Sequence, residues 1–222
     1  MKTNNAPHEL PLHCIIREPL VKTKRPPVIF MLHGYGSNEE DLFSFANELP
    51  AKYAVVSVQA PHKLADFGYA WYSIDFQSEQ GKWSDDAQAV ESRDLIVEFI
   101  DATCELYGYD TKNITLIGFS QGSILSMAVA LSYPDKIRNV IALSGYLNTN
   151  ILKEDYRERT HFTPKFYISH GLSDQVIPVE WARQTVNILK ELNVDYTYEE
   201  FPVGHGVSPQ NFYSFREWLP QQ

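Results

Sequence analysis

The chain has 222 residues and a formal net charge of −9. Hydrophobic residues make up 44% and charged residues 21%, which excludes a disordered chain, a collagen-like chain and a coiled coil. The acidic balance, with no basic stripe to neutralise phosphates, argues against nucleic acid as a partner. The length fits a single α/β domain over residues 1–222, with residues 1–11 expected to form a loose N-terminal segment.

The cysteines and the N-terminus bear on where the protein works. Cys14 and Cys104 are too few and too far apart for a disulfide framework or a zinc site, so we expect a reduced, cytoplasmic protein without a metal. The N-terminal stretch lacks the apolar core of a signal peptide. No apolar run approaches the ~18 residues that cross a bilayer, so we expect no stable membrane insertion.

Short β-rich runs alternate with longer helical stretches. The predicted strands span residues 12–17, 28–32, 54–58, 114–117, 140–143, 166–168 and 196–201, and the first and last read as strands near an edge. The predicted helices span residues 38–49, 85–107, 121–132 and 180–192, with Asn38 as a cap and Gly108 as a stop. Such alternation predicts a mostly parallel central sheet with helices on both faces. Because ligand sites lie at the carboxyl ends of such strands, motifs that follow strands are the candidates for chemistry.

A G-x-S-x-G motif at residues 118–122 directly follows a predicted strand and precedes a predicted helix. This context is typical of a nucleophile elbow, in which a strained turn exposes the serine hydroxyl. Ser120 is therefore the candidate nucleophile. Side chains at positions 118 and 122 would collide with neighbouring backbone, which accounts for the two glycines. The alternative is a Gly/Ser turn with no catalytic role.

A serine hydroxyl is a weak nucleophile and needs an adjacent base. Among seven histidines, His205 follows the last predicted strand, in a loop that could reach over the strand ends. A histidine base needs a carboxylate to orient it, and Asp174 lies in the loop after the strand at 166–168. Taken singly, His205 could be a solvated loop residue and Asp174 a loop anchor or helix cap. Three such elements, each in a loop or turn that follows a predicted strand, favour a catalytic triad.

Acyl transfer also needs two backbone N–H groups aimed at the oxyanion that develops in the transition state. One would be the N–H of Gln121, at a helix N-terminus. The other would come from the His-Gly-Tyr-Gly loop at 33–36, with the N–H of Tyr35 as the candidate. The alternative for this loop is a plain glycine-rich turn. A phosphate-binding loop is excluded, because the chain has neither a GxxxxGKS/T nor a GxGxxG motif.

These motifs together resemble the phospholipase/carboxylesterase family of α/β-hydrolases, which includes bacterial carboxylesterases and acyl-protein thioesterases. The likeness runs from about Pro27 to Leu219. It implies an α/β-hydrolase fold without a large lid domain, and ester or thioester hydrolysis without a cofactor. Tyr35 stands where family members commonly carry leucine, which leaves the backbone donor intact. The resemblance implies Ser120, Asp174 and His205 as the triad, and Tyr35 and Gln121 as the oxyanion donors.

Aromatic residues make up 13% of the chain, and a group of them lies between residues 67 and 83. In a fold without a cap domain such a loop can wall the acyl pocket, or it can pack onto the body of the protein. We expect Trp71 and Tyr72 to be the substrate-binding residues. The group consists of Phe67, Tyr69, Trp71, Tyr72, Phe76 and Trp83.

The sequence thus predicts a serine carboxylesterase that acts on a small-molecule ester or a lipid through an acyl-enzyme. Lysophospholipase, acyl-protein thioesterase and peptidase activities stay open as alternatives. A dienelactone-type hydrolase is disfavoured, because such enzymes carry cysteine at the nucleophile position. The non-enzyme alternative is a hydrolase-fold binding protein with a silent site. The resemblance is also compatible with a homodimer.

Overall fold

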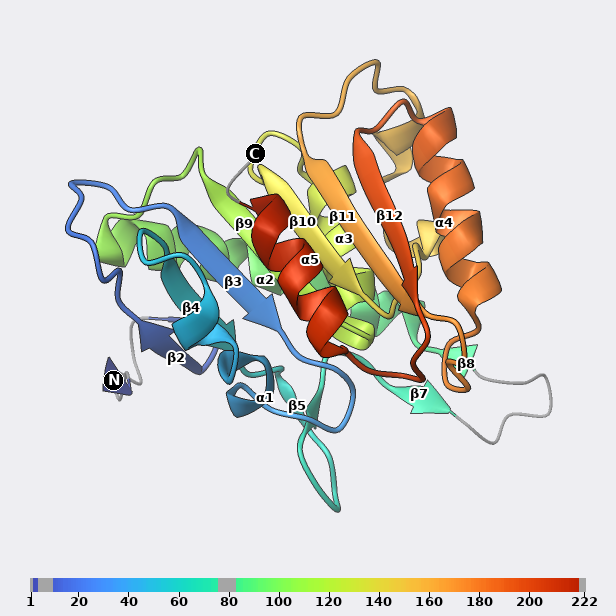
Figure 1. The fold of residues 1–222 in the computed structure, drawn as a ribbon, viewed down its shortest axis with the longest axis horizontal. Helices are drawn as coiled ribbons and strands as arrows, with labels where there is room; N and C mark the ends of the chain where they lie inside the picture. Colours follow the sequence, from blue (N-terminus) through green and yellow to red (C-terminus); the bar gives the residue numbers. More distant parts are fainter. Residues whose placement is uncertain (1, 4–9, 76–82, 220–222) are drawn as a thin grey trace.

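A computed structural model describes residues 2–3, 10–75 and 83–219. Among these residues an eight-stranded sheet runs in the order β1-β2-β4-β3-β9-β10-β11-β12 (Figure 1). Strands β3, β4 and β9 to β12 are parallel, and β1 and β2 are antiparallel. The predicted mostly parallel sheet is therefore confirmed. The strands are β1 (Lys2–Thr3), β2 (Cys14–Arg17), β3 (Val28–Leu32), β4 (Ala54–Val58), β9 (Ile114–Phe119), β10 (Asn139–Leu143), β11 (Lys165–Gly171) and β12 (Tyr196–Phe201).

The burial of the strands follows their composition. Strands β3, β4 and β10 are buried along their whole length, as expected for continuous apolar runs covered on both faces. Strand β12 carries threonine and glutamates, is half-buried and forms the outer edge of the sheet. In the expected loose segment 1–11, Lys2–Thr3 instead pairs antiparallel with β2. Residues 1 and 4–9 lie outside the described residues.

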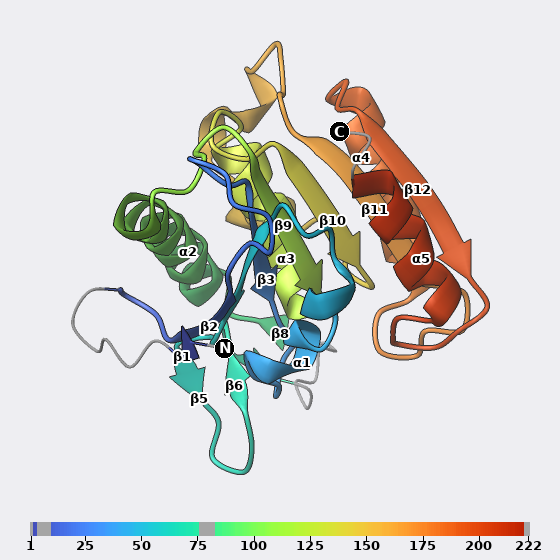
Figure 2. The same ribbon diagram turned by 60° about the vertical axis from the view of Figure 1, so that its left-hand side comes forward.

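Helices cover both faces of the sheet and enclose two hydrophobic cores (Figure 2). Helices α2 (Asp86–Tyr107), α3 (Gln121–Ser132) and α4 (Val179–Glu191) bury apolar side chains in the larger core. Helices α1 (Glu40–Phe43) and α5 (Pro209–Trp218) lie over the other face and close the smaller core. Residues 44–49 contribute to the same smaller core.

Local capping explains where α2 begins and ends. The short length of the segment at 38–49 explains why the helix predicted there is broken. The Asp85 side chain accepts the Gln88 N–H at the start of α2, and Gly108 ends the helix in the left-handed conformation at φ 70°. The predicted helix over 38–49 was wrong in extent. It divides into α1 and a 3₁₀ helix, η1 (Ala46–Glu48), because so short a segment gains few helical hydrogen bonds and takes its shape from packing.

Two small hairpins stand beyond the carboxyl ends of the parallel strands. One joins β5 (His62–Lys63) to β6 (Tyr69–Ala70), and the other joins β7 (Ile74–Asp75) to β8 (Trp83–Ser84). They add walls to this edge of the sheet. In the part of the chain that the structure describes, every helix is too short or too polar to cross a membrane.

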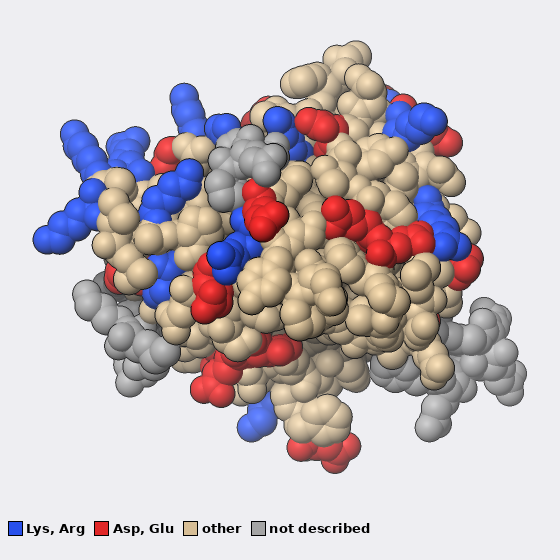
Figure 3. Space-filling view, viewed as in Figure 1, with Lys and Arg blue, Asp and Glu red and all other residues tan. Residues whose placement is uncertain are grey.

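Charge is distributed unevenly over the molecule. On the face shown in Figure 3, Lys and Arg side chains gather at the upper left, around the segment that leads into β3. The lower part of this face, where the parallel strands end, shows uncharged atoms and acidic side chains in most places.

Candidate active site

Ser120 lies on the tight turn that joins β9 to α3. Its backbone has φ 52° and ψ −115°, a conformation that a non-glycine residue adopts only where the surrounding structure imposes it. The Ser120 N–H donates to the carbonyl oxygen of Leu143 on the neighbouring strand at 2.9 Å. This strand-to-strand bond holds the turn at the carboxyl edge of the sheet, where the serine hydroxyl can meet other loops.

The two glycines of the motif are required by the close approach of neighbouring backbone. A Cβ at Gly118 would overlap the carbonyl group of Gly122, and a Cβ at Gly122 would overlap the carbonyl group of Leu32 at the end of β3. The expected collision at both positions is confirmed. Gly122 therefore lets the first turn of α3 pack directly against the strand that leads into the 33–36 loop.

The structure brings the three predicted triad residues together. His205 Nε2 lies 2.9 Å from Ser120 Oγ, and His205 Nδ1 lies 2.7 Å from Asp174 Oδ2. The ring of Phe119 packs on the His205 ring, with the centroids 4.9 Å apart. These contacts form a continuous hydrogen-bonded path from a hydroxyl through an imidazole to a carboxylate. Such a path can take up the hydroxyl proton as the oxygen attacks an electrophile.

The Asp174 carboxylate is fully buried and well supplied with hydrogen bonds. Its Oδ1 accepts the N–H groups of Val176 and Ile177 at 2.8 and 2.9 Å. Its Oδ2 accepts from His205 and also lies 3.3 Å from Nε2 of a second histidine, His170. Because His170 Nε2 also meets the Ile177 carbonyl at 2.8 Å, this nitrogen carries the proton. His170 thus ties both the candidate triad acid and its loop to β11.

His33 fixes the direction of the backbone in the 33–36 loop. Its Nε2 accepts the N–H of Ala60 at 3.0 Å, so its Nδ1 carries the proton and donates to the Gly34 carbonyl at 2.8 Å. Burial lowers the pKa of His33, which favours this neutral form. In a trans peptide the Gly34 carbonyl and the Tyr35 N–H point in opposite directions. The His33 ring therefore directs the Tyr35 N–H away from itself.

Gly34 packs directly against the nucleophile, since a Cβ built there would lie 3.3 Å from the Ser120 Cβ. The second candidate donor, the Gln121 N–H, opens α3, where the first backbone N–H groups have no intrahelical acceptor. Both candidate oxyanion donors thus flank Ser120. Their position agrees with the expected roles, which stay predictions.

Of the two aromatic residues expected to bind substrate, Tyr72 lines a cavity and Trp71 faces the interior of the protein. Trp71 is fully buried, and its indole N–H donates to the His33 carbonyl at 2.9 Å, so it braces the 33–36 loop from inside. Tyr72 lines a cavity beside Ser120. The Gln121 side chain contacts the backbone of both residues. It accepts the backbone N–H of Trp71 at 2.8 Å and donates to the backbone carbonyl of Tyr72 at 2.7 Å. Of the other loop aromatics, Phe76 and the Trp83 side chain lie outside the described residues.

The cavity beside Ser120 has a volume of about 30 Å³. Several residues that line it were not predicted, because they come from four separate segments and share no local sequence pattern. In the described part of the chain, no group of three His, Cys, Asp or Glu side chains is placed to hold a metal ion. The lining consists of Tyr72, Ile74, Ser84, Ser120, Gln121, Ile124, Tyr146, Ile177 and Trp181.

Comparison with solved structures agrees with this fold. The esterase PE8 superposes with a TM-score of 0.80 over 95% of this chain and 98% of its own, at 22% identity. The Bacillus cereus carboxylesterase superposes with a TM-score of 0.76 over 95% and 94%, at 20% identity. The sheet order and the strained serine turn, with these structural likenesses, define an α/β-hydrolase fold.

Sequence comparison identifies the family. The phospholipase/carboxylesterase model matches residues 16–221, and the chain belongs to this family of hydrolases. Acyl-protein thioesterase 1 of Emericella nidulans is 26% identical over 220 residues, which covers 88% of this chain and 90% of that protein. The family predicted from the sequence motifs is thereby confirmed.

Proposed function

We propose that the protein is a serine carboxylesterase that hydrolyses acyl esters through a covalent acyl-enzyme. The observation that carries this proposal is the unbroken path from Ser120 through His205 to Asp174, with both contacts below 3 Å. The strained Ser120 turn supports it, since such strain marks a position held for chemistry. Family membership supports the same reaction class.

In the acylation half, Ser120 Oγ attacks the carbonyl carbon of the ester while His205 Nε2 takes up the hydroxyl proton. The Tyr35 and Gln121 N–H groups stabilise the resulting oxyanion. When the tetrahedral intermediate collapses, the C–O bond to the alcohol breaks, and His205 returns the proton to the leaving oxygen. Asp174, buried against the His205 Nδ1 side, stabilises the transient imidazolium.

In the deacylation half, a water molecule replaces the alcohol. His205 takes a proton from the water as its oxygen attacks the acyl carbon, and the second tetrahedral intermediate forms in the same oxyanion site. Its collapse breaks the bond to Ser120 Oγ, which recovers its proton from His205. The products are a carboxylic acid and the free enzyme, and the cycle calls for no group beyond these residues.

Neutral esters and lipids are the proposed substrates. The net charge of −9 disfavours strongly anionic substrates, and acidic side chains lie in the lower part of the face shown in Figure 3. A thioesterase activity is the second candidate, and it is favoured by the 26% identity to an acyl-protein thioesterase. The same residues would act on either bond, because both reactions pass through a tetrahedral oxyanion.

Three further expectations stay proposals. The buried, unpaired state of Cys14 and Cys104 supports a reducing compartment, and with it a cytoplasmic location. The continuous sheet supports a single domain over residues 1–222. A homodimer is compatible with the family resemblance.

The test is Ser120→Ala, measured with p-nitrophenyl acetate and with a fluorophosphonate probe. We expect a loss of about 10⁴-fold or more in kcat and no labelling, because the nucleophile is gone. The matched control is Ser123→Ala in the same helix, which removes a buried hydroxyl that has no hydrogen-bond partner in the structure. Unchanged turnover in Ser120→Ala would overturn the proposal. A wild type that neither turns over substrate nor takes up the probe would favour a binding protein.

A further inference from the structure

A groove lies on the far side of two residues that line the cavity beside Ser120. The groove has a volume of about 360 Å³, against about 30 Å³ for the cavity. Tyr146 and Trp181 line both spaces. Their rings meet edge to face, with centroids 4.8 Å apart and an interplanar angle of 76°. The ring pair is therefore the partition between a small space at the nucleophile and a large one beyond it.

The partition is held closed by a buried hydroxyl. Thr185 is 1% exposed, and its Oγ accepts the N–H of Leu147, the residue after Tyr146, at 2.7 Å. The same hydroxyl donates to the Trp181 carbonyl at 3.0 Å. Thr185 thus joins the segment that carries one ring to the helix that carries the other. The edge-to-face contact adds about 0.5–1.5 kcal/mol to such a pair.

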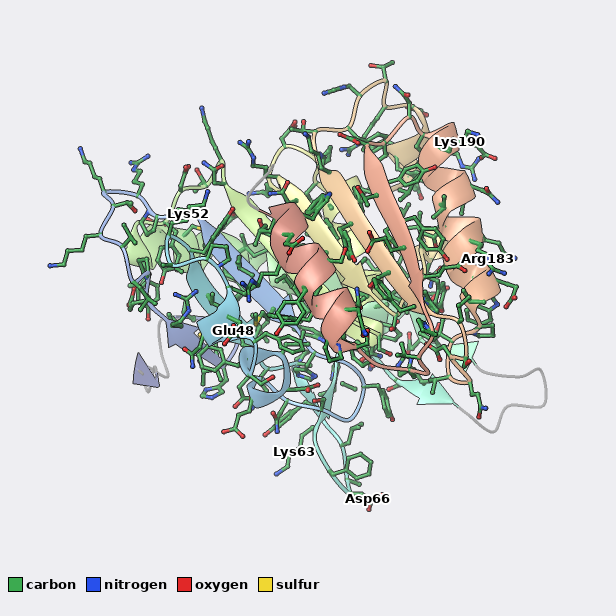
Figure 4. The ribbon with its side chains drawn as sticks, in the orientation of Figure 1. Glu48, Lys52, Lys63, Asp66, Arg183 and Lys190 are labelled. Carbon is green, nitrogen blue, oxygen red and sulfur yellow. The ribbon has the colours of Figure 1, made fainter. Side chains whose placement is uncertain are left out.

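The sequence of α4 places this wall on one side of the helix. Trp181, Thr185 and Ile188 are spaced four and three residues apart, and all three line the groove. Figure 4 shows Arg183 and Lys190 on the same helix, and the Arg183 guanidinium pairs with Glu200 of the edge strand β12 at 2.7 Å. The helix also lines the groove with Gln184, and the polar segment 148–150 lines it from outside the helix, so the Trp181 and Ile188 side chains are the apolar part of the wall that the helix contributes.

The size of the inner cavity limits what can lie beside the serine. A water-sized group needs about 10–15 Å³ by the same measure, so a 30 Å³ cavity takes two or three such groups. With the carbonyl group held at Ser120, two or three such groups are the alkyl tail of a propionate or butyrate ester, and the shorter acetate tail also fits. A longer acyl chain would have to displace the Trp181 ring or leave its methylenes in water.

We propose that the Tyr146–Trp181 ring pair sets the acyl-chain length, so that the protein selects short-acyl esters, and that the groove beyond the pair is the path a longer chain follows once Trp181 is removed. This proposal rests on the proposed esterase function. Ile124 and Ile177 form the apolar sides of the inner cavity, at 4% and 1% exposure, and so favour an acyl group over a polar one.

The test compares kcat/KM for p-nitrophenyl acetate, butyrate and octanoate in the wild type and in Trp181→Ala. In the wild type we expect kcat/KM to fall from butyrate to octanoate. Each methylene that becomes buried gains about fourfold in binding. Trp181→Ala should therefore raise the octanoate-to-acetate ratio on the order of tenfold or more. Trp181→Leu opens the partition less, serves if the alanine variant does not fold, and should raise the ratio in the same direction.

The matched control is Ile188→Ala, which changes the groove but not the inner cavity. Alone it should leave the ratio unchanged, and combined with Trp181→Ala it should lower octanoate hydrolysis while sparing acetate. An octanoate-to-acetate ratio that does not change in folded Trp181 variants would overturn the proposal, as would a wild type that prefers octanoate. In either case acetate turnover by the wild type would leave the esterase function standing. A wild type inactive on all three esters would overturn both.

Discussion

Replacing His33 by leucine tests whether the neutral imidazole sets the direction of the Tyr35 N–H. The substitution removes the acceptor of the Ala60 N–H and the donor to the Gly34 carbonyl while filling a similar volume. A buried N–H left without an acceptor costs about 1–3 kcal/mol, and the lost bond to Gly34 about 0.5–1.5 kcal/mol. We therefore expect the free energy of unfolding to fall by about 2–4 kcal/mol.

The catalytic effect should be separable from this loss of stability. Once the Gly34 carbonyl is released, the 34–35 peptide can rotate, and one oxyanion donor is no longer held in place. Removing one such donor costs about 10²–10³-fold in kcat. Because the donor acts on the transition state, kcat and kcat/KM should fall together while KM for p-nitrophenyl acetate changes little.

The assay is steady-state ester hydrolysis well below the melting temperature of the variant, with a thermal melt to establish the folded fraction. His161→Leu is the matched control, since it makes the same change at an exposed loop histidine. A His33→Leu variant that is folded and retains kcat within about threefold of the wild type would refute the reasoning. The Tyr35 N–H would then be held without the imidazole.

The remaining predictions concern pH and the second histidine at Asp174. Burial holds the pKa of His33 below its ordinary value of 6.5, so the unfolded chain binds more protons than the folded one below that pH. The contribution of His33 to the free energy of unfolding is therefore fully present above pH 6.5 and is lost as the pH falls, by up to about 1.4 kcal/mol per pH unit. Urea titrations at pH 7.5, 6.5 and 5.5 should show that the free energy of unfolding declines less with falling pH in His33→Leu than in the wild type. An equal decline in both proteins would contradict this role of His33. His170→Leu should lower kcat by up to about 10²-fold, because the Ile177 carbonyl loses its donor and the loop that carries Asp174 is no longer tied to β11. His170→Gln places an N–H donor near the same point and should restore kcat, whereas a leucine variant with the wild-type kcat would show that His170 only fills space.

The central strands could be predicted because they are short apolar runs bounded by turn residues, and residues 28–32 and 54–58 form strands with the predicted limits. The strand predicted at 166–168 extends over 165–171, because its ends are polar residues and a glycine that pair with neighbouring strands without adding to the apolar run. The segment after Asn38 was less predictable. Its apolar spacing suits a helix, yet a short helix is only marginally stable, and packing decided where it broke.

In the candidate site, the triad residues could be predicted from the sequence, whereas the residues that line the cavity could not. Ser120, Asp174 and His205 follow strands that end at one edge, so topology alone brings them together. The cavity walls could not be predicted, because Trp181 occupies a position in α4 whose periodicity is that of ordinary core packing. The sequence also could not distinguish Tyr72, which lines the cavity, from Trp71 beside it, which faces the interior.

The position of β12 has a consequence for the order of folding. Ser120 and His205 are 85 residues apart in the chain, and His205 follows the last strand to join the sheet edge. Contacts of such long separation form late, since the loops between them must close first. During synthesis the candidate nucleophile, its turn and both candidate oxyanion donors are made before His205, the candidate base for Ser120. Under the proposed mechanism, catalytic activity therefore reports on the completed fold, because a chain that ends before β12 lacks the histidine that would activate Ser120.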